Sequence, residues 1–156
     1  MGQDAAMGDA EQAQEALAGV RGMFAADRAS RGLGIEVTGL SVGQATAVMS
    51  VTAQMLNGHG SCHGGYVFLL ADTAFSLACN SYGMVTVAAG ADITFVAPVR
   101  EGDQLQAHAQ ERTRFGRRGI FDVTVRRDDG GVVAEFRGHS HATAEPLRPP
   151  GPGDGG

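Results

Sequence analysis

The chain has 156 residues, the length of a single domain, and 43% of them are hydrophobic, which is enough to form a core. Twelve basic residues against seventeen acidic ones give a net charge of −5, which argues against a nucleic-acid or membrane-surface binder. All twelve basic residues are arginine, so Schiff-base lysine chemistry is excluded. With no signal peptide or membrane-length apolar run evident, we expect a cytoplasmic protein with Cys62 and Cys79 reduced.

Both ends of the chain differ in composition from the middle. Residues 1–9 are small and polar, and residues 145–156 contain four of the five prolines and nothing to bury. We therefore expect disorder at both ends and a single domain over residues 10–144.

The first half of this domain predicts one helix and two strands. Apolar residues at three-to-four spacing predict a helix from Asp9 or Ala10 to about Arg31. The period then changes to two, which predicts two antiparallel strands joined by a turn at Gly39–Gly43, the second strand reaching Met55.

The middle of the chain predicts a buried helix, Tyr66–Ser81, which is apolar on nearly every side. Only this helix lies within the series of strands, so a doubly wound parallel sheet is excluded. The predicted fold class is α+β: an antiparallel sheet of about five to six strands wrapped around one long central helix, with an N-terminal helix. The strands expected after the buried helix are Val85–Val96, Asp103–Phe115, Ile120–Arg127 and Val132–Thr143.

Asp72 is the one acidic residue in the buried helix, and no basic residue accompanies it there. An unpaired carboxylate there costs several kcal/mol unless it is solvated, paired or used. Two interpretations stay open. Asp72 faces water or pairs with an arginine from a strand, or it is a general base or nucleophile in an apolar pocket that raises its pKa. Ser76 lies one turn later on the same face, where it can hold a water or orient the carboxylate.

Gly64 and Gly65 precede this helix and leave no side chain over its N-terminus. The free N–H groups and the positive dipole end suit a developing oxyanion, although an ordinary glycine entry to a buried helix explains them too. Gly64 and Asp72 are eight residues apart, or ~12 Å along a helix. One small molecule can touch both only if a second subunit supplies one of them, so we predict a homodimer with two sites across its interface.

Several weaker patterns suggest other chemistry. His59, Cys62 and His63 lie in one loop, but no second cluster has metal-ligand spacing, so we predict no metal or cofactor and expect His63 to orient the loop. A glycine-rich dinucleotide turn and a Cys62 nucleophile are weaker alternatives. A cluster of arginines is either a solvated hairpin tip or a phosphate contact; its members are Arg112, Arg114, Arg117 and Arg118.

Residues 63–74 read His-Gly-Gly-x-x-Phe-x-Leu-Ala-Asp-Thr-Ala. This segment resembles the helix-entry motif of hotdog-fold acyl-CoA thioesterases, and most closely that of the PaaI, or phenylacetate-pathway, family. The resemblance covers roughly residues 17–143 and implies a sheet around a central helix, paired as a homodimer and often doubled to a homotetramer. Further matching segments are Met55–His59, Ala78–Ser81, Pro98 with Gly102 and Asp103, and Phe136–His141.

By this resemblance, Gly64 would polarise the thioester carbonyl, and Asp72 from the other protomer would be the nucleophile or general base. His63, Asn57 and Thr73 would be supporting residues, with Thr73 placing the attacking water, and Ser76 matches a position of similar role. The implied partner is a coenzyme A thioester, phenylacetyl-CoA or hydroxyphenylacetyl-CoA. The other candidate substrate-binding residues are Gly65, Phe68, Phe75, Arg117 and Arg118, of which the two phenylalanines could equally belong to the core.

Two alternatives remain open at this point. One is a thioesterase for another acyl group, such as a fatty acyl or a naphthoyl group. The other is a non-catalytic acyl-CoA-binding protein of the same fold.

Overall fold

The computed structural model describes residues 2–149 and 151. No helix in this part of the chain combines the length and the apolar character needed to cross a membrane. The helices are α1 (Gly2–Ala25), α2 (Arg28–Gly32) and α3 (Gly64–Asn80), with a short 3-10 turn, η1 (Ala53–Met55). The strands are β1 (Glu36–Ser41), β2 (Gln44–Ser50), β3 (Met84–Phe95), β4 (Gln104–Phe115), β5 (Arg118–Arg127) and β6 (Val132–Pro146).

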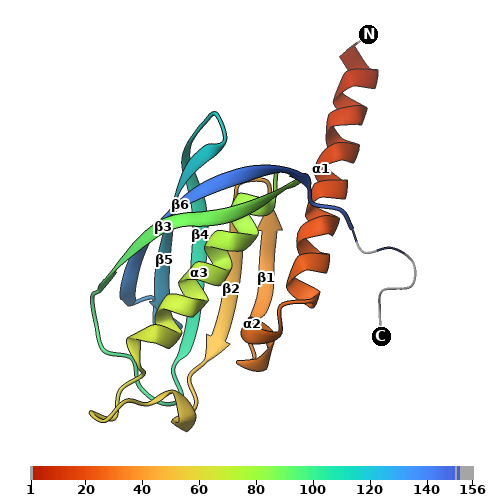
Figure 1. Cartoon of the computed structure of the whole chain (residues 1–156). Helices are drawn as coiled ribbons and strands as arrows, with labels where there is room; N and C mark the ends of the chain where they lie inside the picture. Colours follow the sequence, from red (N-terminus) through yellow and green to blue (C-terminus); the bar gives the residue numbers. More distant parts are fainter. Residues whose placement is uncertain (1, 150, 152–156) are drawn as a thin grey trace.

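The six strands form one antiparallel sheet in the order β1-β2-β4-β5-β6-β3. The sheet curves around α3, and α1 packs at the β1 side and projects beyond the sheet (Figure 1). The predicted fold class is confirmed. Strands β3 and β1 are the two edges of the sheet, and α3 contacts all six strands.

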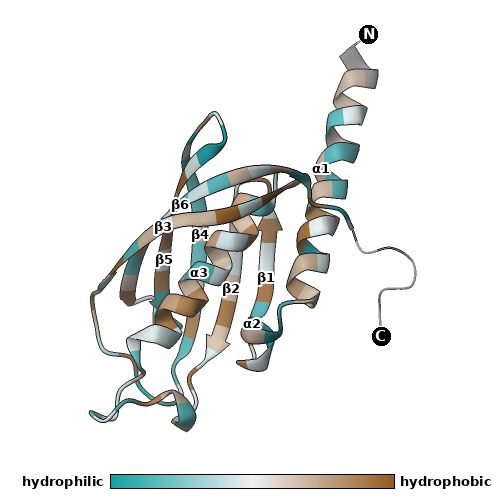
Figure 2. Ribbon diagram, in the orientation of Figure 1, coloured by the Kyte–Doolittle hydropathy of each residue, from teal (hydrophilic) through white to brown (hydrophobic). Residues whose placement is uncertain are grey.

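Alternating side chains of the sheet pack onto α3 to form the core. On β4, for example, Leu105, Ala107 and Ala109 are buried while the residues between them are exposed. Phe75 of α3 is 1% exposed, and its ring lies 5.8 Å from the rings of both Phe121 and Phe136. Figure 2 shows the corresponding apolar colour along α3 and the strands that face it.

The N-terminal helix differs from its prediction at both ends. It begins at Gly2, so residues 2–9 are helical where disorder was expected, in keeping with their content of good helix formers such as Ala5, Ala6 and Met7. It ends at Ala25, six residues before the predicted limit, because Asp27 caps a separate helix, α2.

Two strand boundaries also differ. The second strand was expected to reach Met55, but β2 ends at Ser50 and a 3-10 turn buries Met55, whose apolar spacing mimics strand alternation. Strand β6 extends through Pro146, and the Leu147 N–H donates to the Gly83 carbonyl, so the start of the predicted disordered tail is ordered by tertiary contacts. Residues 150 and 152–156 of that predicted tail lie outside the described residues.

Candidate active site

The first turn of α3 is organised by His63. His63 is the N-cap residue, and its Nδ1 accepts a 2.9 Å hydrogen bond from the Gly65 N–H. Its carbonyl accepts a hydrogen bond from the Tyr66 N–H. The Gly64 N–H, in contrast, has no acceptor among the residues that the structure describes. Of these three donors, Gly64 alone is therefore free to bind a developing oxyanion.

His63 and Asn57 shape the loop before α3. Because Nδ1 of His63 accepts a hydrogen bond, the proton of the neutral ring resides on Nε2, and the residue is exposed. Asn57 Oδ1 accepts hydrogen bonds from the N–H groups of His59, at 2.8 Å, and Ser61, at 3.3 Å. The two side chains thus fix the path of the backbone that presents Gly64.

Gly64 lies against the outer edge of the Phe95 ring. A Cβ at position 64 would lie 2.8 Å from Cζ of Phe95, whose side chain is 53% exposed at the end of β3. A groove of about 430 Å³ opens beside Gly64. The groove is lined by Ser61, Cys62, Gly64, Val67, Phe95, Val96, Ala97, Pro98, Val99 and Val133.

Asp72 lies two turns further along α3 and is half-buried. Its carboxylate makes no hydrogen bond or ion pair with any residue in the described part of the chain. Burial raises the pKa of Asp72, and the negative charge of Asp27 raises it further. The structure therefore supplies no arginine partner for Asp72, and the unpaired carboxylate is available as a base.

Thr73 is buried against α2. Its hydroxyl lies 2.8 Å from the Leu69 carbonyl and 2.9 Å from the Ser30 hydroxyl, and it shares its one proton between these two acceptors. Ser30 in turn donates to Asp27 Oδ2 at 2.6 Å, while its N–H donates to Oδ1 of the same carboxylate at 2.9 Å. This chain of hydrogen bonds joins α2 to α3 beside Asp72. Asp27 and Ser30 were not predicted from the sequence, although Asp-x-x-Ser at the start of a helix is a recognisable capping signal.

A small cavity of about 160 Å³ lies between the end of α1 and the central part of α3. Ser76, which is half-buried, contributes to its wall together with Thr73 and Asp27. Asp72 does not line the cavity itself, but Thr73, the next residue, and Ser76, one turn later, do. Its full lining is Met23, Phe24, Asp27, Thr73, Ser76 and Leu77.

The remaining predicted site residues lie apart from this cavity. Phe75 is enclosed in the core, and Phe68 is half-buried with its ring 5.3 Å from that of Phe136. Arg117 and Arg118 are exposed at the β4–β5 hairpin, near the C-terminal end of α3. The chain on its own does not join these arginines to Gly64.

The cysteines offer neither a nucleophile nor a metal site in this structure. Cys62 and Cys79 are free and buried. Burial raises the pKa of Cys62, and burial together with the charge of Asp72 raises the pKa of Cys79 to about 12, so both remain neutral thiols. Within the described residues, no three histidine, cysteine, aspartate or glutamate side chains converge on one point.

One continuous helix runs from Gly64 to Asn80, so Gly64 and Asp72 lie on the same helix. Eight residues of α-helix separate the Gly64 N–H from Asp72 by ~12 Å. Along α3 the half-buried residues form a stripe that the sheet leaves partly uncovered, and edge strand β3 exposes apolar side chains. The stripe is Phe68, Leu69, Asp72 and Ser76, and the exposed apolar residues of β3 and the segment after it are Val87, Phe95 and Val96.

Comparison with known proteins identifies relatives of this chain. The family model described as Thioesterase superfamily matches residues 59–134. The chain is 46% identical over 119 residues to the acyl-coenzyme A thioesterase PaaI of Escherichia coli, covering 76% of this chain and 85% of the relative. A putative esterase of Archaeoglobus fulgidus is 30% identical over 127 residues, covering 81% of this chain and 82% of that relative.

Solved structures of PaaI proteins are also similar to this chain. The structure of the Escherichia coli PaaI protein from the phenylacetic acid degradation operon aligns with a TM-score of 0.83 at 41% identity, covering 86% of this chain and 98% of the other. A mutant of the phenylacetic acid degradation protein PaaI from Thermus thermophilus aligns with a TM-score of 0.72 at 33% identity, covering 75% and 100%.

Proposed function

Because this chain belongs to the thioesterase superfamily, we propose that it is an acyl-CoA thioesterase that hydrolyses phenylacetyl-CoA and hydroxyphenylacetyl-CoA to the free acid and coenzyme A. The proposal rests on one observation above all. A free N–H at the start of α3 and an unpaired, half-buried carboxylate on the same helix are the two groups that thioester hydrolysis needs. The arylacetyl group is proposed because the similar Escherichia coli protein comes from a phenylacetic acid degradation operon.

Gly64 and Asp72 together can carry out the hydrolysis in a few steps. The Gly64 N–H donates to the thioester oxygen, which makes the carbonyl carbon more electrophilic. Asp72 takes a proton from water as the water oxygen bonds to that carbon, and the negative charge moves onto the oxygen held by Gly64. The carbonyl then re-forms, the carbon–sulfur bond breaks, and the departing thiolate receives the proton. If Asp72 attacks directly, an anhydride forms with loss of thiolate, and water then hydrolyses the anhydride.

We infer that each site is shared between two protomers. The ~12 Å along α3 prevents one thioester from contacting Gly64 and Asp72 of the same chain. A second copy seated on the uncovered stripe of α3 and on the apolar edge β3 would bring its own Asp72 toward Gly64. We propose a homodimer as the active unit, with a homotetramer as its further assembly.

We also propose that Arg117 and Arg118 bind the phosphates of coenzyme A. Both are exposed, and neither forms a salt bridge to a described residue. Replacing both with alanine should raise KM several-fold and leave kcat unchanged, because exposed guanidinium–phosphate contacts contribute to ground-state binding. Arg126→Ala, an exposed arginine on the same strand as Arg118, is the control. An unchanged KM in the double variant would refute this role.

The free, buried cysteines suit a reducing compartment, so we propose that the enzyme works in the cytoplasm. Secretion of an active form with oxidised cysteines would contradict this.

Thiol release from an acyl-CoA panel tests the function. The panel contains phenylacetyl, hydroxyphenylacetyl, benzoyl, naphthoyl, acetyl and decanoyl thioesters, with wild type beside Asp72→Asn. We expect arylacetyl thioesters to give the highest kcat/KM and the variant to lose about 10²–10⁴-fold in kcat. Asp122→Asn is the matched control, because that carboxylate lies on the exposed face of the sheet, paired with Arg137. Retained turnover in Asp72→Asn would refute the assignment.

Mixing two inactive variants tests the shared site. Asp72→Asn and Gly64→Pro protomers each lack one half of the chemistry. Random exchange at equal amounts makes half the dimers hybrid, each with one intact and one doubly defective site, so activity should return to about a quarter of wild type. If the mixture stays inactive although mass spectrometry shows hybrid dimers, both groups act within one chain and the proposal is wrong.

A further inference from the structure

Two cavities meet at the side chains of Phe24 and Leu77. The smaller cavity, of about 160 Å³, is the one lined by Asp27, Thr73 and Ser76, and it lies near Asp72, whose pKa is raised by burial and by the charge of Asp27. A second cavity of about 600 Å³ lies between α1, α2 and β1. Phe24 and Leu77 belong to the lining of both, so together they form the wall between them.

The two cavities differ in what they can hold. A cavity of about 150 Å³ in a protein core accommodates one benzene molecule, so the smaller cavity has the volume of a single aromatic ring. The larger one has the volume of an ordinary ligand site. Its floor is apolar, formed by Ile35, Val37 and Leu40, and polar groups stand at its rim. An alkyl chain fits such a floor.

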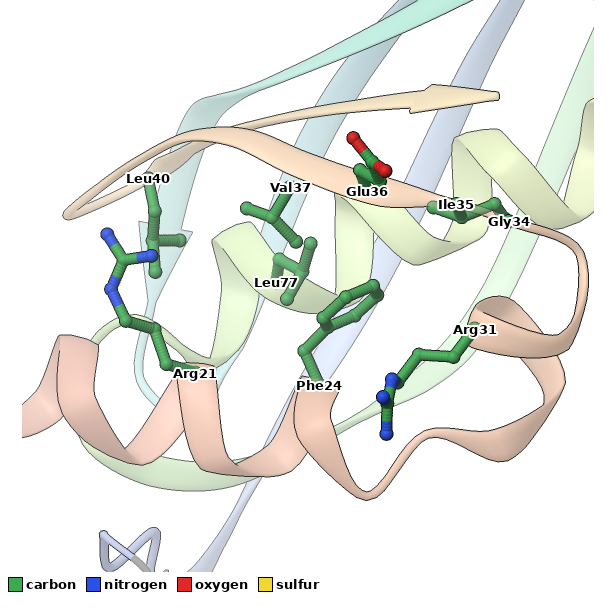
Figure 3. Close-up of a pocket in the computed structure, with 9 residues that line it drawn as sticks. All are labelled: Arg21, Phe24, Arg31, Gly34, Ile35, Glu36, Val37, Leu40 and Leu77. Carbon is green, nitrogen blue, oxygen red and sulfur yellow. The ribbon is translucent and has the colours of Figure 1, made fainter. Parts of the chain in front are cut away.

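Of the two shared residues, Phe24 is the less enclosed. Leu77 is 1% exposed and held in the core, whereas Phe24 is half-buried near the end of α1. Figure 3 shows the Phe24 ring pointing from α1 toward Leu77, with Arg21 and Arg31 on either side of it. The Arg31 guanidinium donates to the Ala25 carbonyl at 2.7 Å and so fixes α2 against the end of α1, which holds Phe24 in place.

We propose that Phe24 is the specificity-determining residue for the acyl group: its ring closes the cavity beside Asp72 at the size of one aryl ring and excludes longer acyl chains from the larger cavity. This inference rests on the proposed thioesterase function and names its substrate class. Removing the ring merges the two cavities into one channel, which starts at Thr73 and Ser76 and continues over the apolar floor of the larger cavity. Long-chain acyl groups can then lie over Val37 and Leu40.

Phe24→Ala tests this directly. We expect kcat/KM for decanoyl-CoA to rise about tenfold or more, while kcat/KM for phenylacetyl-CoA falls because the ring loses a packing surface. Leu40→Ala is the matched control, since Leu40 lines only the larger cavity and its loss should leave the ratio of the two substrates unchanged. Phe24→Leu, a smaller perturbation of the fold, should shift the ratio in the same direction to a lesser extent.

A binding measurement separates this inference from the proposed function. Calorimetric titration with the non-hydrolysable thioether analogues of phenylacetyl-CoA and decanoyl-CoA reports the acyl preference even without turnover. Phe24→Ala should reverse the order of the two dissociation constants. An unchanged order in Phe24→Ala, or the same reversal in Leu40→Ala, would overturn the role of Phe24. Failure of the proposed function is a different result: a wild-type protein that binds both analogues and hydrolyses no thioester.

Discussion

Gly64→Pro and Gly64→Ala together isolate the contribution of a single N–H group. Both variants place a Cβ where the glycine has none, 2.8 Å from the Phe95 ring edge, but only proline removes the N–H. Phe95 is 53% exposed, so its ring can turn outward to admit the new atom in either variant.

The local backbone accepts proline at this position. Gly64 is the first residue of α3, where a proline loses no intrahelical hydrogen bond and its fixed φ suits the helix. His63 has φ −60° and ψ 131°, the extended conformation that a residue before proline favours. The Gly64 N–H has no acceptor in the described part of the chain, so its removal breaks no bond of the fold.

The expected loss follows from the chemistry of the donor. Removing one oxyanion donor lowers kcat by about 10²–10³-fold, or ~2.7–4 kcal/mol of transition-state stabilisation. Phenylacetyl-CoA hydrolysis, followed by thiol release, should show that loss in Gly64→Pro relative to Gly64→Ala, with thermal unfolding confirming that both variants fold. Equal turnover in the two variants would refute the assignment of this N–H as the oxyanion donor.

Two further predictions concern stability. Burial and the charge of Asp27 raise the pKa of Asp72, so the ionised form of this carboxylate destabilises the fold as the pH rises through that pKa. Asp72→Asn should therefore raise Tm near neutral pH by about 2–4 °C, and this gain should disappear below about pH 4, where the wild-type carboxylate is neutral too. Calorimetry at both pH values checks this, and a difference in Tm that does not depend on pH would contradict it. Gly138→Ala should lower the free energy of unfolding by about 1–3 kcal/mol, because the new Cβ would lie 2.6 Å from the enclosed Phe75 ring. Gly90→Ala is the control and should leave the free energy of unfolding unchanged, because its Cβ would meet nothing within 4 Å. Denaturant unfolding of both variants measures the difference.

The sequence predicted best those elements whose pattern is local. The apolar run of α3 and the period-two strands after it contain their own boundaries, and the observed limits lie within a few residues of the predicted ones. The break between α1 and α2 depends on one capping residue, Asp27, that a continuous apolar period conceals. The docking of Leu147 depends on Gly83, which is distant in the sequence, so composition alone suggested disorder there.

The candidate site also contains features that are local in the sequence and features that depend on packing between distant segments. Gly64, His63 and Asp72 fall within ten consecutive residues, where helical spacing already relates them. Ser30 and Thr73 are 43 residues apart and meet only because α2 packs against α3. The wall formed by Phe24 likewise exists only once α1 has packed beside α3. Periodicity places each helix but does not state which faces of two helices meet.

The position of Asp72 connects the stability of the protomer to the proposed assembly. On a fully enclosed face of α3 an unpaired carboxylate would be too costly to keep ionised, and on an open face its pKa would resemble that of any surface aspartate. The stripe that the sheet leaves partly uncovered is intermediate between these extremes, which agrees with the half-buried state of Asp72 and its raised pKa. A second protomer that covers this stripe would desolvate the carboxylate further and bring it to the free N–H of the other chain. The same contact would then complete the site and strengthen its base.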